Sequence, residues 1–119
     1  MSEQEILEGN KLIAEFDGAI FTNDDTEAYP QGYLYFQDIG AREAKNLMYN
    51  DSWDWIMPVV EKIHSYTDFW VTIYYRSCKV SPMNRGVEME ILIEEKPTIE
   101  AVWIAVVEFI KWHNKQQGK

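Results

Sequence analysis

Residues 97–112 read PTIEAVWIAVVEFIKW and form the clearest helical pattern in the chain. Pro97 followed by Thr98 is typical of a helix start, and lysines near the end suit the negative end of the helix dipole. Six apolar side chains recur three and four residues apart and therefore share one stripe of the helix: Ile99, Val102, Trp103, Val106, Val107 and Ile110. We expect this stripe to be buried and the helix to give way to a polar tail at 114–119.

Two segments before this helix are typical of β-strands. Residues 69–75, FWVTIYY, are β-branched or aromatic throughout, so both faces can be buried and a central strand is favoured. If both faces are buried, helices cover both sides of the sheet and the domain has three layers. In residues 87–94 apolar side chains alternate with glutamates, so one face of that strand should meet water. A turn at 81–86, which contains Pro82 and Gly86, separates the two strands.

The first part of the chain predicts a helix followed by a hairpin. The helix should run from about Glu3 to Asp17, with Gly18 in the left-handed conformation that closes a helix. A start only at Asn10 is the alternative, because Gly9 weakens the middle of such a helix. Residues 19–22 and 33–37 are then typical of two short strands, joined by a long acidic loop.

The middle of the chain predicts a second helix. Asn50-Asp51-Ser52 can cap its start, and its apolar residues continue to about Ser65. Pro58 predicts a kink or a late start, because proline removes one hydrogen bond from the interior of a helix. Residues 39–49 are compatible with a short helix of their own.

The predicted order is therefore helix, two strands, helix, two strands, helix. Short connections favour antiparallel hairpins. We expect an α+β fold in which an antiparallel sheet of about four strands packs with three helices, in a single domain over 1–119.

The charge of the chain is concentrated in its first third. The net charge is −9, and the first 38 residues contain nine acidic side chains but only one lysine, Lys11. This surplus of acid opposes binding to nucleic acid, whose phosphates require a basic surface. One cysteine allows no internal disulfide, and no signal peptide or membrane span is apparent, so we expect a cytoplasmic protein without a membrane partner.

The motifs of common catalytic and cofactor sites are missing. Neither GxGxxG nor GxxxxGK[ST] occurs, and two histidines do not suggest a zinc site. Asn23, Asp25 and Glu27 alternate as in a calcium loop, but no glycine follows at the sixth position, so a solvated loop is favoured. Cys78 with a histidine could form a nucleophile and base, although a small buried residue is the more common role. We predict no cofactor, no metal and, on balance, no enzyme.

Two stretches resemble small uncharacterised proteins of bacterial genomes and prophages. They are SWDWIMPVVEKI at 52–63, and IEAV at 99–102 continuing to AVVEFIKW at 105–112. The resemblance covers about a quarter of the chain. It implies a bacterial or phage origin and nothing about catalysis.

Two functional hypotheses follow from the charge and the aromatic residues. In the first, the chain is a non-enzymatic acidic interaction module that binds a basic protein partner through Asp24, Asp25, Glu27, Tyr29, Tyr33 and Tyr35. In the second, it is a small-molecule-binding protein or small enzyme with a pocket between sheet and helices, lined by Trp53, Trp70, Tyr74 and Trp103. Self-association through residues 86–94 or through Trp112 is a third alternative.

Overall fold

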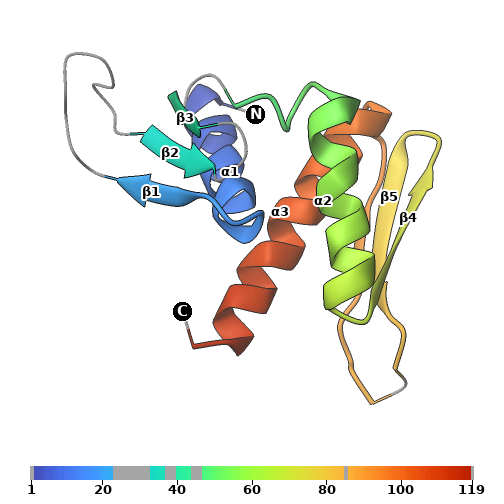
Figure 1. The fold of residues 1–119 in the computed structure, drawn as a ribbon. Helices are drawn as coiled ribbons and strands as arrows, with labels where there is room; N and C mark the ends of the chain where they lie inside the picture. Colours follow the sequence, from blue (N-terminus) through green and yellow to red (C-terminus); the bar gives the residue numbers. More distant parts are fainter. Residues whose placement is uncertain (1, 23–32, 37–39, 44–46, 85, 119) are drawn as a thin grey trace. The chain divides into compact units, whose positions relative to one another are not determined.

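A computed structural model shows an α+β protein (Figure 1). It describes the backbone of residues 2–22, 33–36, 40–43, 47–84 and 86–118, and the side chains of 2–19, 47–84 and 86–118. The described residues form three helices and two three-stranded antiparallel sheets, in the order helix, three strands, helix, three strands, helix. The predicted α+β class and antiparallel pairing are confirmed, but the single sheet of about four strands is wrong.

The chain divides into two compact units, Met1–Met48 and Tyr49–Lys119. We call them unit 1 and unit 2 and describe each by itself. The prediction of one domain over 1–119 stays a prediction.

Unit 1 begins with helix α1, Glu3–Phe16. The Ser2 side chain accepts a hydrogen bond from the Glu5 N–H at 3.1 Å, and glutamates in the first turn suit the positive end of the helix. At the other end Gly18 has φ +100°, while the Gly18 and Ala19 N–H groups donate to the Glu15 and Ala14 carbonyls. These two bonds form a Schellman motif, as the glycine predicts.

The sheet of unit 1 contains β1 Ile20–Thr22, β2 Tyr33–Phe36 and β3 Gly40–Glu43, in that order across the sheet. The predicted pair β1 and β2 is confirmed. The short helix at 39–49 is wrong, because Gly40–Glu43 pairs in antiparallel register with β2. Pairing gives alternate backbone groups of β3 partners on β2, which local helical propensity does not take into account.

Unit 2 contains the two remaining helices, α2 Trp53–Tyr66 and α3 Thr98–Gln116. Helix α2 starts at the predicted place, with Ser52 as its N-cap residue, and continues through Pro58, so the late start is wrong. The Ser52 carbonyl, rather than its side chain, makes the first bonds of the helix. Helix α3 includes residues 114–116, which we expected in the polar tail.

The sheet of unit 2 contains β4 Phe69–Tyr74, β5 Ser77–Pro82 and β6 Ile91–Ile93. Strand β5 lies in the middle, so the prediction that residues 69–75 form a central strand is wrong. Strand β4 is an edge strand, and its side chains alternate between buried and exposed positions from Phe69 to Val71. The β6 strand is much shorter than the predicted 87–94.

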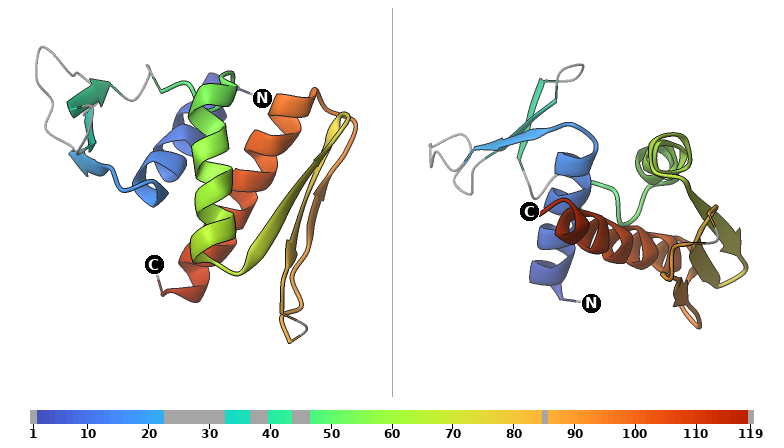
Figure 2. Two further views of the ribbon diagram at one scale, coloured as in Figure 1. Left: turned by 45° about the vertical axis from the view of Figure 1, so that its right-hand side comes forward. Right: turned by 90° about the horizontal axis from the view of Figure 1, so that it is seen from below.

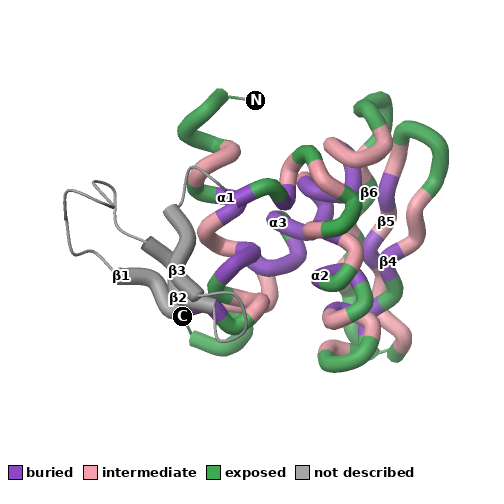
Figure 3. The backbone as a smooth tube through the Cα atoms, turned by 45° about the horizontal axis from the view of Figure 1, so that its top comes forward, coloured by how far each residue is buried: buried purple, intermediate pink, exposed green. Residues whose placement is uncertain are grey.

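Helices α2 and α3 cover one face of this sheet (Figure 2). Helix α2 packs on β4 and α3 packs on β5 and β6, so unit 2 has two layers rather than the three expected of a strand buried on both faces. Phe69 meets Phe109 and Trp112 edge-on, with ring centroids 5.0 and 5.3 Å apart. Figure 3 shows the buried positions along these elements, which include Ile56, Val60, Ile63, Val71, Cys78, Val80, Val102, Trp103, Val106, Phe109 and Ile110.

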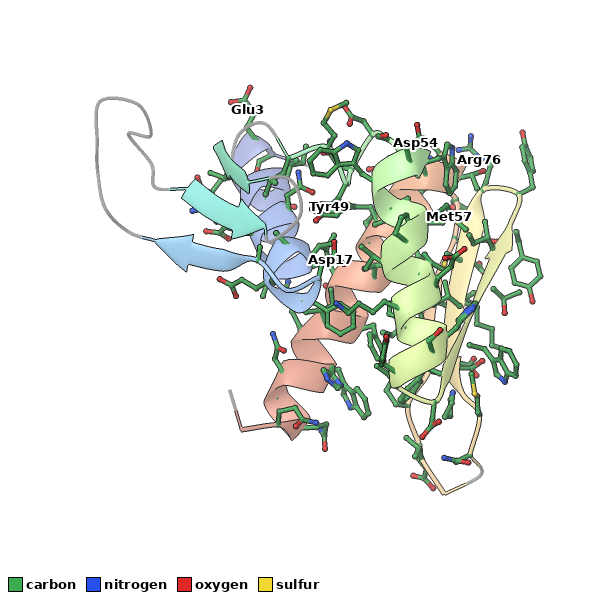
Figure 4. The ribbon with its side chains drawn as sticks, in the orientation of Figure 1. Glu3, Asp17, Tyr49, Asp54, Met57 and Arg76 are labelled. Carbon is green, nitrogen blue, oxygen red and sulfur yellow. The ribbon has the colours of Figure 1, made fainter. Side chains whose placement is uncertain are left out.

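A two-residue turn joins β4 to β5 and contacts the start of α3. Arg76 in this turn has φ +57°, and its N–H donates to the Thr98 hydroxyl at 3.1 Å (Figure 4). The Arg76 carbonyl accepts from the Lys96 N–H. These bonds hold the hairpin against the helix that packs beneath it.

Candidate functional site

The first predicted binding surface falls mainly outside the described residues. Asp24, Asp25, Glu27 and Tyr29 all lie there. Tyr33 and Tyr35 occupy alternate backbone positions of β2, opposite Thr22 and Ile20. Elsewhere in unit 1, four of the acidic side chains are exposed on α1: Glu3, Glu5, Glu8 and Glu15. Binding of a partner by this acidic segment stays a prediction.

The four residues of the predicted aromatic pocket are not brought to one place. Trp103 is 3% exposed and belongs to the core on the helix-covered side of the sheet. Trp70 and Tyr74 alternate with the buried residues of β4 and are 53% and 52% exposed. Trp53 is partly exposed at the first position of α2. The structure therefore does not place these four side chains around one pocket.

The open face of the unit 2 sheet is the strongest candidate site. We use this name for the face opposite the helices, formed by alternate residues of the three strands: Trp70, Thr72, Tyr74, Ser77, Lys79, Ser81 and Leu92. The register sets Thr72, Lys79 and Leu92 in one row across the sheet. Leu92 is 49% exposed, so three large side chains with apolar surface are accessible on this face.

The border of the open face along β6 is acidic. Glu88, Glu90, Glu94 and Glu95 are all exposed, which confirms that the glutamates of this segment meet water. The Lys79 ammonium lies 3.7 Å from a Glu90 carboxylate oxygen. Both groups are substantially exposed, so this ion pair contributes little to stability but offsets part of the local charge.

The β4 edge of the same sheet is occupied by a histidine from α2. The Val71 N–H donates to His64 Nε2 at 2.8 Å, and the His64 and Trp70 rings meet edge-on with centroids 6.0 Å apart. Nε2 also lies 3.2 Å from the Val71 carbonyl oxygen, and it accepts the hydrogen bond from the Val71 N–H in the tautomer that carries the ring proton on Nδ1. His64 thus satisfies a backbone group that an edge strand would otherwise leave unpaired.

Cys78 has the properties of a core residue rather than of a nucleophile. Its side chain is fully buried between β4 and β6, and burial raises the pKa of the thiol to about 11. The reactive thiolate is therefore disfavoured at neutral pH. His113 stacks on Phe109 with ring centroids 5.8 Å apart. The burial of Cys78 agrees with the small buried role that the sequence favoured.

A search of the described residues for three or more metal-ligating side chains in one place finds no such group. No helix in the described part of the chain is both long and apolar enough to cross a bilayer.

Comparisons of the chain with models of protein families, with curated proteins and with solved structures found no match. The resemblance to bacterial and prophage proteins therefore stays a prediction based on residues 52–63 and 99–112.

Sequence reasoning missed two parts of the open face, Lys79 and Leu92. A signal for Lys79 was present, because polar and apolar residues alternate in Ser77-Cys78-Lys79-Val80-Ser81. A signal for Leu92 was present too. Leu92 lies two residues from both Glu90 and Glu94, so its side chain points to the same, solvent-facing side of the strand. Both faces of β4 carry apolar side chains. The sequence therefore does not reveal which face of β4 the helices cover and which face they leave open.

Proposed function

We propose that this chain is a non-enzymatic interaction module and that the open face of the unit 2 sheet binds a basic protein partner. The main support is that Trp70, Tyr74 and Leu92 are exposed on this face, while both helices of unit 2 pack on the opposite face of the sheet. Tryptophan and tyrosine are the residues most enriched in binding hot spots, since they bury a large area at a small entropic cost.

The charge supports a basic partner. Most of the net charge of −9 belongs to the first 38 residues, so the local support is the row of exposed glutamates that borders the open face along β6. A negative potential around an apolar centre attracts a positively charged partner and disfavours acidic ones. Because these carboxylates are exposed, the attraction should weaken as salt shortens the Debye length.

The placement of the reactive side chains is consistent with a role without catalysis. The Cys78 thiol is buried with a raised pKa, and His64 Nε2 is engaged by a backbone N–H. Neither the Cys78 thiol nor His64 Nε2 is therefore positioned to act on a bound molecule.

The proposal can be tested by selecting binders from a displayed library of ten-residue random peptides. The bait is the full chain at low salt, and the matched control bait carries Trp70→Ser and Tyr74→Ser. We expect peptides rich in Lys or Arg to be enriched on the natural chain and lost from the control bait. High salt should remove them from the natural chain as well.

The proposal is wrong if no peptide is enriched over the control bait, or if the enriched peptides are acidic. A circular dichroism spectrum of the control bait establishes that the two substitutions, which are at exposed positions, leave the fold intact.

A further inference from the structure

We infer that the partner binds as an added strand along the outer edge of β6, antiparallel to it, with basic residues opposite Glu90 and Glu94. This inference rests on the proposed function and names the mode of binding. Strand addition to an exposed sheet edge derives its affinity from main-chain hydrogen bonds and its specificity from alternate side chains.

The register of the sheet shows which backbone groups of β6 point outward. The Val71 N–H points away from β5, because it donates to His64. In an antiparallel pair the direction alternates along a strand, so Thr72 points toward β5 and bonds with Lys79.

The same alternation continues across β5 to β6. Since Lys79 bonds with β4, its neighbours Cys78 and Val80 point toward β6 and bond with Ile93 and Ile91. The Leu92 N–H and C=O therefore point away from β5. In the described part of the chain β6 ends the sheet, so these two groups face the edge where another strand can pair.

The side chains beside this edge indicate which kind of strand can bind there. Glu90 and Glu94 are exposed and have the same parity as Leu92 on either side of it. In a second copy pairing symmetrically about Leu92, Glu90 of each chain would face Glu94 of the other. Like charges directly opposite each other destabilise a strand pair, so a basic strand is favoured over a second copy.

The matching strand has the pattern basic, apolar, apolar, apolar, basic. Its central residue pairs with Leu92, and its two basic residues lie opposite Glu90 and Glu94. A suitable probe is a nine-residue peptide with the core Lys-Val-Leu-Val-Lys and blocked ends.

The test compares this probe with two peptide variants by calorimetric titration of the full chain. One variant carries N-methyl-leucine at the centre, which removes the N–H that would bond to the Leu92 carbonyl. The other has glutamate in place of both lysines. We expect each change to weaken binding by tenfold or more.

Substitutions in the protein provide the reciprocal test. Glu90→Lys with Glu94→Lys should weaken the lysine probe at least tenfold and allow the glutamate peptide to bind. Glu61→Lys with Glu108→Lys, at exposed positions on α2 and α3, is the matched control and should change the affinity for the lysine probe less than threefold.

The outcomes separate this inference from the proposed function. If N-methylation has no effect while the lysine probe fails to bind the chain with Trp70→Ser and Tyr74→Ser, strand addition is wrong and the interaction module stands. If the lysine probe does not bind, although the display selection yields basic binders, the assigned edge is wrong. A concentration-dependent dimer that Leu92→Pro abolishes would identify a second copy as the occupant and overturn the inference. If neither the display selection nor the probe shows binding, the proposed function fails as well.

Discussion

His64 connects helix α2 to the edge strand β4 through one hydrogen bond. Its Nε2 accepts from the Val71 N–H, and the ring packs edge-on against Trp70. The bond pairs an edge group of β4, and this leaves the β6 edge as the place where we propose that a strand adds.

Replacing His64 by phenylalanine should lower the free energy of unfolding by about 1–2 kcal/mol, because a ring remains while the acceptor for the Val71 N–H is lost. Urea unfolding of the full chain measures this effect. Tyr66→Phe is the control, since this side chain near the end of the same helix is 79% exposed. An equal loss in both variants would contradict the assigned role of His64.

Cys78 makes stability depend on pH in a defined window. Burial raises its pKa from 9.0 to about 11, so the folded state keeps the neutral thiol where the unfolded chain has already lost the proton. The contribution of the Cys78 thiol to the free energy of unfolding is therefore complete below pH 9 and falls as the pH rises from 9 to 11.

The measurement compares urea unfolding of the natural chain and of Cys78→Ala at pH 8 and pH 10.5. The natural chain should be the more stable at pH 8, because the alanine leaves a cavity. Its advantage should be smaller at pH 10.5. Tyrosines and lysines titrate in both proteins, so they cancel in the difference, and an unchanged advantage would show that the thiol is not buried.

The elements show which local signals can be recognised in a sequence. The start of α1 and its glycine end follow from capping chemistry within a few residues. Helix α2 starts where residues 50–52 indicated, although the Ser52 side chain makes no capping bond. Strands β3 and β5 were missed, because they depend on partners. The Tyr75-Arg76 turn before β5 contains no glycine although Arg76 has a positive φ, so the usual turn signal is absent.

The candidate site was only partly predictable for the same reason. The glutamates beside β6 were recognised as solvent-facing from their alternation with apolar residues. Trp70 and Tyr74 were named but assigned to a pocket, since a strand that is apolar on both faces does not reveal which side the helices cover. That choice is made by packing between α2, α3 and the sheet.

The end of α1 provides a test at the scale of an element. Gly18 has φ +100°, and the space around a Cβ atom built on it is open within 4 Å. Gly18→Ala should therefore lower the free energy of unfolding by about 1 kcal/mol through backbone strain alone.

Gly86→Ala is the matched control, because Gly86 has equally open surroundings and no positive φ. It should be neutral within about 0.5 kcal/mol or slightly stabilising. A Gly18→Ala variant as stable as the natural chain in thermal and urea unfolding would rule out the left-handed cap.

On the scale of the whole molecule the chain consists of two units, and unit 2 has a core of its own. Residues from α2, β4, β5 and α3 contribute to it, and the Phe69, Phe109 and Trp112 rings contact one another. This core supports the open face on the opposite side of the sheet.

We expect a fragment of residues 49–119 to fold without unit 1. Its far-ultraviolet circular dichroism should show helix, and it should unfold cooperatively on heating, because its buried apolar side chains come from four of its own elements. The full chain is the reference. A fragment with the spectrum of an unfolded chain would show that the unit 2 core depends on residues 1–48.

The central claim, that the open face and the β6 edge bind a basic strand, is tested most directly by hydrogen exchange at the Leu92 amide. Nuclear magnetic resonance of the full chain can follow this amide with and without the lysine probe. The account predicts that Leu92 becomes strongly protected on binding, with shift changes at Trp70, Lys79 and Leu92. Bound probe that leaves the Leu92 exchange rate unchanged and shifts residues of α2 and α3 instead would contradict it.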